Sequence, residues 1–544
     1  MKMFARFLIL ALSFEFIVGA NNNVPSSEEA IEELCSGRPS SEYFRLSTDG
    51  DCRAVYRCDS HGVGGSEVRL AEVKCPSGLS FDIGRQTCDW KNNVYDCDQL
   101  SKPRLSKPKL VTLEPLCSEG EDYIQCGSGE CKIKTAYCDG TPDCNDGSDE
   151  NVCSFNEDPN KVAECDLSQC VLPDCYCSAD GTRIPGNTGE EDATDVNQTP
   201  QMIVLSFNGA VTGINAGIYD KIFNEERVNP NGCSVKGTFF VSHKFTNYSA
   251  VQELHRRGHD IGVFSISNKD NTKYWTEPEY DDWLSEMAGG RLIIESFSNI
   301  TDGSVVGVRC PYLFTGGNTQ FEVMADQFFA YDSSITAPLS NVPIWPYTLH
   351  YRIPHACTGS GHCPSRAYPI WELPINELDR RDDPDFDEIL TGCSLVSSCS
   401  NIYEADQFKR LLQHNFNRHY SSNRAPLSLS FDASWLQSKK GFVNTLTKWM
   451  DETLSEKNDV YFVSQIQVIQ WMQNPTTVTS LREFEEWKTA CKVGGQPLCS
   501  LPNPCPLTTR ELPGEVHRLH TCMSCPDNYP WVLDPTGKGF SLKK

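Results

Sequence analysis

The distribution of cysteines limits what this chain can fold into more than any other feature. Six of its 27 cysteines fall between residues 35 and 97, and six more fall between residues 117 and 153. Segments this short bury too little apolar surface to fold on a core alone, so disulfides must hold them together. Such cysteine density is typical of secreted proteins. The odd total predicts at least one thiol that is free or paired between chains.

The amino terminus predicts export from the cell. Lys2 and Arg6 lead into the apolar run Phe7–Gly19 and then Ala20, an order typical of a secretory signal peptide over residues 1–20. No later stretch is long and apolar enough to span a bilayer. We therefore expect a secreted protein of the extracellular matrix. Acceptor triplets for N-glycosylation begin at Asn197, Asn247 and Asn299.

The net charge argues against one class of partner. The chain carries 48 Lys and Arg against 73 Asp and Glu, a net charge of −25. This charge repels a phosphate backbone, so nucleic acid is not an expected partner. An apolar fraction of 39% excludes a wholly disordered chain and favours a large core beside the small modules.

The first module runs from Cys35 to Cys97 and has aromatic residues between its cysteines. Six cysteines alone leave 15 connectivities open. The order resembles the peritrophin-A type chitin-binding domain, and the resemblance implies chitin as the ligand. Sugar rings stack on aromatic side chains, so we expect a platform formed by Tyr56, Phe81 and Trp90, unless these side chains fill a small core. The pairing that the resemblance implies is Cys35–Cys58, Cys52–Cys97 and Cys75–Cys88.

A linker and a second module follow. Residues 99–115 repeat Ser-Lys-Pro without apolar periodicity, as an extended spacer would. The second module, 117–153, has five carboxylates between residues 138 and 150, and dense oxygen donors suit calcium. It resembles an LDL-receptor class A repeat, which also binds protein partners. The resemblance implies side-chain ligands Asp139, Asp143, Asp149 and Glu150, carbonyl ligands Ala136 and Thr141, and disulfides Cys117–Cys131, Cys126–Cys144 and Cys138–Cys153.

A Cys-rich and acidic connector, 165–200, leads into one large unit, 201–544, which ends in a Cys-rich extension. Short apolar runs in this unit alternate with helical patterns, which favours a (β/α) barrel or an open α/β sheet. Barrels carry their chemistry at the carboxyl ends of the strands. The expected strands are 202–207, 238–241, 261–264, 305–308, 328–331, 427–431 and 460–463, and the expected helices are 250–257, 281–297 and 442–457.

Several segments of the large unit resemble the polysaccharide deacetylases, specifically the insect chitin deacetylases that carry the same two amino-terminal modules. The matching segments are IVLSFNGA at 203–210, GTFFVSH at 237–243, RCPYL at 309–313, YDSS at 331–334, NELDRRDDP at 376–384 and QWMQNP at 470–475. The resemblance covers nearly the whole chain. It implies two disulfide-rich modules followed by a distorted (β/α) barrel of the polysaccharide deacetylase type.

The chain departs from this family where the family places its chemistry. The family's first strand ends in Phe-Asp-Asp, whose carboxylates act as general base and zinc ligand, but this chain has Asn208 and Gly209 after the Phe. The family's two zinc-binding histidines correspond to Phe264 and Asn268. Its histidine acid corresponds to Asp432. We therefore expect that the catalytic residues are lost and that zinc is absent.

The loss matters because hydrolysis of an acetamide needs an activated water. Zinc lowers the pKa of bound water from 15.7 to about 7. Gly209 and Phe264 have no donor atom, and Asn268 is a poor ligand for zinc. Two other groups could hold a metal, although disulfide-tied loops are the stronger expectation in an oxidising compartment. These groups are His355, Cys357, His362 and Cys363, and His517, His520, Cys522 and Cys525.

The residues expected at a remaining substrate groove are Arg309, Pro311, Tyr312, Asp332 and Trp435, because their family positions line the cleft, orient the base or offer a backbone N–H to the acetyl oxygen. The alternative is packing within the barrel, which is the stronger expectation for Pro311. The sequence therefore predicts a secreted chitin-binding protein with an inactive deacetylase-like domain. One alternative is an active chitin deacetylase with an unorthodox site. A second alternative is an adaptor that binds an extracellular protein through its calcium module.

Overall fold

The computed structural model describes most of the large unit and parts of the two small modules. The described residues are 31, 34–35, 43–46, 52–61, 67–75, 79–83, 87–90, 94, 97, 123–126, 131–133, 144, 162–186, 196–276, 278–357, 361–381, 392–400, 402–491, 499 and 501–539. The expected signal peptide, the 99–115 linker and the six calcium ligands lie outside these residues. So do the side chain of Trp90, the expected partner of Cys131, and both cysteines of the expected Cys138–Cys153 disulfide.

The first module is held by antiparallel hairpins and disulfides. Strand β1 (Ala54–His61) pairs with β2 (Glu67–Lys74), and β3 (Leu79–Asp82) pairs with β4 (Thr87–Trp90). A small core lies under β1, where Phe44 and Cys58 pack together. The described disulfides are Cys35–Cys58, Cys52–Cys97 and Cys75–Cys88, the three pairs that the resemblance implies.

Only a little of the second module is described. Strand β5 (Tyr123–Gln125) pairs with β6 (Cys131–Ile133). The Cys126–Cys144 disulfide has the expected partners. Cys131 is also disulfide-bonded.

The connector packs as part of the large unit. Disulfides Cys165–Cys177 and Cys170–Cys175 tighten it. Tyr176 is buried in the main core, and the backbone N–H of Trp345 donates to the carbonyl of Gly181. This segment is therefore an edge of the domain and not a free linker.

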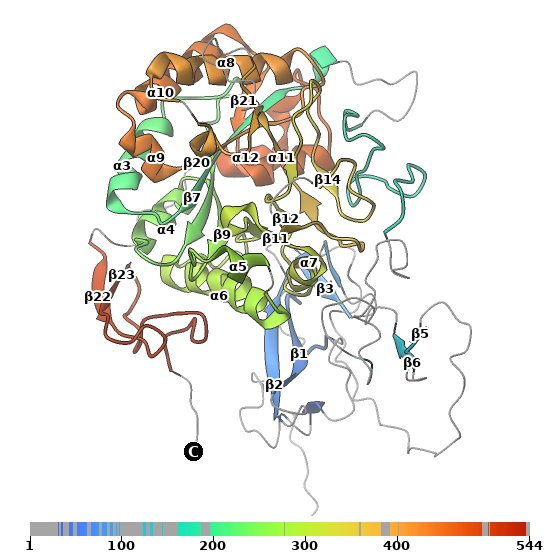
Figure 1. The fold of residues 1–544 in the computed structure, drawn as a ribbon, viewed down its shortest axis with the longest axis vertical. Coiled ribbons are helices and arrows are strands. Elements are labelled where there is room, and N and C mark those ends of the chain that lie inside the picture. Colours follow the sequence, from blue (N-terminus) through green and yellow to red (C-terminus); the bar gives the residue numbers. More distant parts are fainter. Residues whose placement is uncertain are drawn as a thin grey trace, which may run out of the picture. The chain divides into compact units, whose positions relative to one another are not determined.

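Nine strands form the central sheet of the large unit (Figure 1). Their side chains are mostly buried, as expected for a sheet with packing on both faces. All neighbours are parallel except the first pair. The hydrogen-bonded order is β14 (Tyr347–Thr348), β16 (Trp371–Glu372), β12 (Tyr331–Asp332), β10 (Gly307–Val308), β9 (Asp260–Ser265), β8 (Thr238–Ser242), β7 (Gln201–Gly209) and β20 (Leu427–Asp432), and β21 (Val460–Val463) also pairs with β7.

The expected distorted barrel is an open half-barrel. Among the described strands no ladder joins β14 to β20, the two ends of the order. Strands on the β14 side are only two residues long, so the predicted run 305–308 contributes just Gly307 and Val308. Gly307 is required at this place, because a Cβ there would lie 2.1 Å from the ring of Tyr331. The remaining short strands are β11 (Thr315–Gly316), β13 (Thr336–Ala337), β15 (Gly361–His362), β17 (Ile375–Asn376), β18 (Leu378–Asp379) and β19 (Gly392–Cys393).

The helices lie around the outside of this sheet (Figure 1). Helices α4 (Tyr248–Arg256) and α6 (Tyr280–Ser298) pack on β9, and α8 (Ala405–Tyr420) packs on β20. Helix α10 (Phe442–Glu456) packs on β21. The others are α3 (Gly213–Ile222), α5 (Thr272–Thr276), α7 (Gly317–Asp326), α9 (Ala433–Ser438), α11 (Gln465–Gln473) and α12 (Glu485–Cys491), with short 3-10 turns η3 (Val196–Gln198), η4 (Pro311–Leu313), η5 (Val396–Ser398) and η6 (Leu481–Glu483).

The carboxyl-terminal extension is a disulfide-tied hairpin. Strand β22 (Asn503–Leu507) pairs with β23 (His517–Thr521), and Cys499–Cys522 and Cys505–Cys525 hold it. The Thr521 hydroxyl donates to the carbonyl of Phe297 at 2.6 Å, which attaches the hairpin to α6. Among the described cysteines, the free thiol is that of buried Cys310.

No helix in the described part of the chain is long and apolar enough to cross a membrane. The three glycosylation triplets differ in exposure. Asn197 and Asn299 are exposed, whereas Asn247 is half-buried. The Asn247 side chain caps α4 by accepting a hydrogen bond from the backbone N–H of Ser249 at 3.1 Å.

Candidate functional site

The residues singled out in the sequence come together because parallel strands end on the same side of the sheet. Asn208 at the end of β7 is the ladder partner of Asp432 at the end of β20. Phe264 lies near the end of β9, and Arg309 follows β10 directly. The site is therefore a cleft floor built from the carboxyl ends of neighbouring strands.

Arg309 is the centre of this floor. It is fully buried, and its Nη1 donates to Asn208 Oδ1 at 3.1 Å and to Ser206 Oγ at 2.8 Å. Its Nε and Nη2 donate to the carbonyl and the hydroxyl of Ser333, both at 2.8 Å. The guanidinium also stacks 4.3 Å from the ring centroid of Phe240. Burial lowers the pKa of Arg309 to about 10, so the side chain is still charged at neutral pH.

Asp432 lies beside Asn208 in a partly buried position. Burial raises its pKa, while hydrogen bonds from Ser397 and Asn208 and the charge of Arg309 lower it. The Ser397 hydroxyl donates to Asp432 Oδ2 at 2.9 Å. The carboxyl group of Asp432 is thus held by two neutral donors beside the positive charge of Arg309.

The three positions that correspond to the family's zinc ligands offer a single neutral amide. Gly209 has φ +102°, and a Cβ built on it would meet no atom within 4 Å. Phe264 packs against the hydrophobic core. Asn268 is exposed with φ +42°, and its backbone N–H donates to Ser265 Oγ at 2.9 Å. Among the described residues, no group of three or more His, Cys, Asp or Glu is arranged to hold a metal ion.

A pair of carboxyl groups lies near the floor. Asp332 and Glu372 are ladder partners on β12 and β16, and both are fully buried. Burial raises the pKa of Asp332 to about 6 and raises the pKa of Glu372 well above its ordinary value. Asp332 also accepts from the hydroxyl and backbone N–H of Ser334, at 2.9 and 2.8 Å. Glu372 is therefore the protonated partner and hydrogen-bonds to the carboxylate of Asp332.

The five residues expected at the substrate groove differ in exposure, and their part in substrate binding stays a prediction. Arg309, Pro311 and Asp332 are buried, so they support the floor and do not line an exposed groove. Tyr312 is 49% exposed and is the one clearly exposed member. Its φ of +56° is unusual for a residue with a side chain, and such strain is often found at binding sites. Trp435 is half-buried and packs edge-on against Phe408 and Phe442.

The cysteines of the two alternative metal clusters form disulfides, as expected for an oxidising compartment. Cys357 pairs with Cys363, and Cys522 and Cys525 pair with cysteines of the carboxyl-terminal hairpin. His355 Nε2 lies 2.9 Å from the hydroxyl of Tyr347. His517 stacks on Tyr529 with ring centroids 4.5 Å apart.

The expected aromatic platform of the first module is wrong in part. Phe81 is fully buried and Tyr56 is 8% exposed, so both fill the small core in place of facing solvent. Three groups around the cleft floor were not predicted from the sequence. These are Ser397, the Ser206–Ser430 hydroxyl pair at 2.8 Å, and Glu372. Isolated serines and a glutamate carry no recognisable sequence pattern. Ser206, Ser430 and Glu372 lie within strands, so only the register of those strands brings them to the site.

Comparison with known proteins gives the family. The chain is 51% identical over 523 residues to Chitin deacetylase 1 of Bombyx mori, covering 96% of this chain and 94% of that protein. The chain belongs to the chitin deacetylase family. It is also 33% identical over 380 residues to Chitin deacetylase 8 of Bombyx mori, covering 69% of this chain and 93% of that protein.

Two parts of this chitin deacetylase family member match smaller families. Residues 35–97 match the chitin binding Peritrophin-A domain, and residues 116–153 match the low-density lipoprotein receptor domain class A. Among solved structures, the chitin deacetylase of the fungal pathogen Colletotrichum lindemuthianum matches with 14% identity and a TM-score of 0.27, covering 50% of this chain and 88% of that one. The two module matches and the 51% identity to Chitin deacetylase 1 give an architecture of two disulfide-rich modules followed by a deacetylase-type domain. The disulfides and the first module indicate a chitin-binding extracellular protein.

Proposed function

We propose that this chain is a secreted chitin-matrix protein that binds chitin and no longer deacetylates it. The observation that carries the proposal is the donor set at the strand ends. Gly209 and Phe264 have no atom that can coordinate zinc, and the amide of Asn268 is a weak ligand in place of an imidazole. The residues present therefore do not fit the zinc ion that the family uses.

The proton-transfer groups support the same proposal. Asn208 Oδ1 accepts from Arg309, and an amide at this position cannot take a proton from water. Asp432 can carry a proton, but acid–base groups alone contribute roughly 10² to 10⁴ in rate. This rate factor is small compared with the effect of a zinc ion, which activates the attacking water by lowering its pKa from 15.7 to about 7.

Chitin binding is proposed to rest mainly on the first module, which matches the Peritrophin-A family over its whole length. In the large domain, Tyr312 presents an exposed ring at the end of β10 with Phe314 6.4 Å away, edge-on. Trp435 lies in the first turn of α9, three residues after Asp432. These rings are proposed contacts for a sugar chain because C–H faces of pyranoses stack on aromatic surfaces.

Calcium is proposed for the second module. Carboxylates at Asp139, Asp143, Asp149 and Glu150 suit a hard cation that takes six to eight oxygen ligands, with the carbonyls of Ala136 and Thr141 completing the set. The ion would hold this small module together and would leave a surface for a protein partner.

Glycans are proposed at the exposed asparagines, and a cuticle-type matrix is the proposed location.

A chitin pull-down tests the binding part. Full-length protein should sediment with chitin beads, and deletion of residues 35–97 should remove most of the bound protein. Tyr312→Ala should weaken the residual binding of the deleted form, whereas Tyr403→Ala, at an exposed aromatic of the loop before α8, serves as the matched control. Unchanged binding after deletion of the module would contradict the proposal.

The second candidate is an active chitin deacetylase, favoured by the 51% identity to a protein of that name. This function predicts that the protein releases acetate from chitin oligomers and that a chelator abolishes the release. The third candidate, an adaptor, expects capture of an extracellular protein that depends on calcium and on residues 117–153 but not on residues 35–97.

A further inference from the structure

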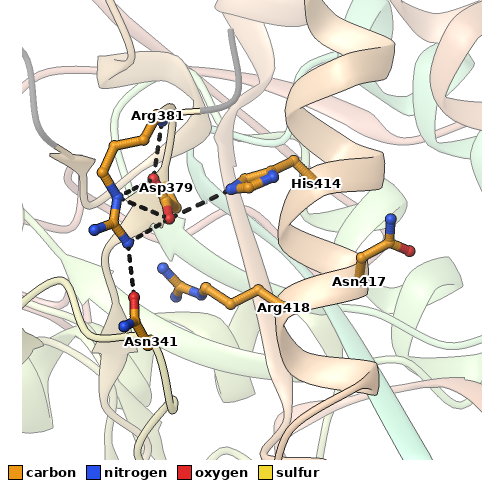
Figure 2. A pocket seen from close by; sticks show the side chains of 6 residues that line it. All are labelled: Asn341, Asp379, Arg381, His414, Asn417 and Arg418. Atoms are coloured by element: carbon orange, nitrogen blue, oxygen red, sulfur yellow. Dashed lines mark hydrogen bonds and ion pairs between the residues drawn. The ribbon is translucent and has the colours of Figure 1, made fainter.

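A pocket beside α8 is a second site, separate from the cleft floor. It has a volume of about 510 Å³ and shares no residue with the strand ends described above. Figure 2 shows that its side chains come from β18, from the face of α8 and from the segment after β13. The lining residues are Asn341, Asp379, Arg381, His414, Asn417 and Arg418.

The one carboxylate of this pocket is already paired. Asp379 accepts from Arg381 Nε at 2.9 Å and from Arg381 Nη2 at 2.7 Å. His414 Nε2 lies 3.3 Å from the same carboxylate. Although burial raises the pKa of Asp379, the hydrogen bonds from Arg381 and His414 bring it down to about 2, so the group is ionised at neutral pH.

Arg418 has no such partner. Its Nη2 donates to the carbonyl of Glu377 at 2.8 Å and lies 3.5 Å from His419 Nε2. Its Nε and Nη1 are buried without any acceptor. No carboxylate in the described part of the chain forms an ion pair with it. Burial lowers the pKa of Arg418 to about 10, so the guanidinium keeps its charge at neutral pH.

Asp379 attracts the Arg418 guanidinium without forming an ion pair with it, and two of the buried donor nitrogens of Arg418 lack an acceptor. This arrangement is costly, and a bound anion would offset that cost. Two arginines against one carboxylate give the pocket a net charge of +1 before His414 is counted, in a chain whose net charge is −25. Asn341 Oδ1 accepts from Arg381 and Asn417 Oδ1 accepts from Gln413, so both amide NH₂ groups remain as neutral donors.

We propose that this pocket binds a small oxyanion of the carboxylate or sulfate class, held between Arg418 and Arg381. Arginine is suited to such groups because its planar fork donates two parallel hydrogen bonds. The proposal is independent of the cleft and of whether the domain hydrolyses chitin.

Calorimetric titration of the full-length protein tests it, with sodium sulfate in one arm and sodium acetate in the other, at constant ionic strength because screening alters charged contacts. Saturable binding of at least one anion is expected, and the stronger arm identifies the class. Arg418→Gln should weaken binding roughly tenfold or more, because hydrogen bonds to charged groups contribute about 1.5–3 kcal/mol each. Arg410→Gln removes the same charge from an exposed position of α8 and should leave binding unchanged.

A second variant covers the case that Arg418→Gln does not fold. Asn417→Asp keeps the acceptor for Gln413 on an exposed position and adds a negative charge to the pocket wall, so it should also weaken binding. Absence of saturable binding, or equal weakening by Arg410→Gln, would overturn the proposal. Anion binding could also appear only after the carboxylates of residues 382–388 are replaced by amides. That result would mean that the chain's own carboxylates occupy the pocket, and it would overturn the proposal.

Discussion

Replacing Arg309 by methionine should destabilise the large domain by about 3–5 kcal/mol. Methionine keeps the length and apolar stem of the side chain but removes the guanidinium. The partners left behind are the Asn208 amide oxygen, two serine hydroxyls and the carbonyl of Ser333, all of them buried. The nearby carboxyls of Asp332 and Asp432 also lose the one positive charge that favours their ionised forms.

The magnitude follows from two limits. Each hydrogen bond to a charged group contributes about 1.5–3 kcal/mol, so simple addition over four bonds would overestimate the effect because bonds of one network are not independent. Measured removals of one partner from buried ionic networks cost about 3–5 kcal/mol. The cost of burying the guanidinium, which lowers the pKa of Arg309 to about 10, is recovered in the variant and keeps the net effect in that range.

Urea unfolding followed by tryptophan fluorescence measures this change, since nine of the ten tryptophans lie after residue 200. Arg309→Lys should be intermediate, because it restores the charge but not the planar fork. The control Arg510→Met removes an exposed arginine and should change the free energy of unfolding by less than about 0.5 kcal/mol. A loss below about 1 kcal/mol for Arg309→Met would refute the assignment of this residue as the centre of the floor.

Three further outcomes follow from the structure. Burial raises the pKa of Asp332 to about 6, so the folded state keeps a proton that the unfolded chain loses near pH 4. This proton contributes about 3 kcal/mol to the free energy of unfolding. The contribution is complete below pH 4 and is lost as the pH rises through 6. Unfolding free energies at pH 4 and 6.5 should therefore fall more for the wild type than for Asp332→Asn, and parallel changes would contradict this. Gly209→Ala should cost roughly 1–2 kcal/mol from its positive φ alone, whereas Gly213→Ala, also with open space, should cost nothing, as urea unfolding would show. Peptide mapping with and without glycosidase should find glycan on Asn299 in preference to the half-buried Asn247, and the reverse order would argue against the exposure described here.

The sequence predicted the elements of the large domain well where patterns are long. The runs expected at 202–207, 427–431 and 460–463 are the cores of β7, β20 and β21, and the helix expected at 281–297 is α6 within one residue at each end. Long buried parallel strands have unbroken apolar runs, so their positions can be predicted from the sequence. The two-residue strands on the β14 side have no such signal, because their conformation is set by neighbours such as the Tyr331 ring against Gly307.

The candidate site was predictable in its residues but not in their exposure. Family positions singled out Asn208, Arg309 and Asp432. In the structure Asn208 is the ladder partner of Asp432 and accepts a hydrogen bond from Arg309. The burial of Arg309 and Asp332 could not be read from the sequence, since charged residues are rarely fully buried unless paired, and their partners come from other strands. The same holds for Phe81 in the first module, whose burial depends on how the hairpins pack.

The most direct test of the account compares zinc content and acetate release from chitin oligomers in two proteins. The wild type should hold no stoichiometric zinc and release no acetate above background. The second protein carries Asn208→Asp, Gly209→Asp, Phe264→His, Asn268→His and Asp432→His, and it should bind zinc and gain turnover if the remaining floor is intact. Stoichiometric zinc in the wild type together with acetate release that a chelator abolishes would contradict the account.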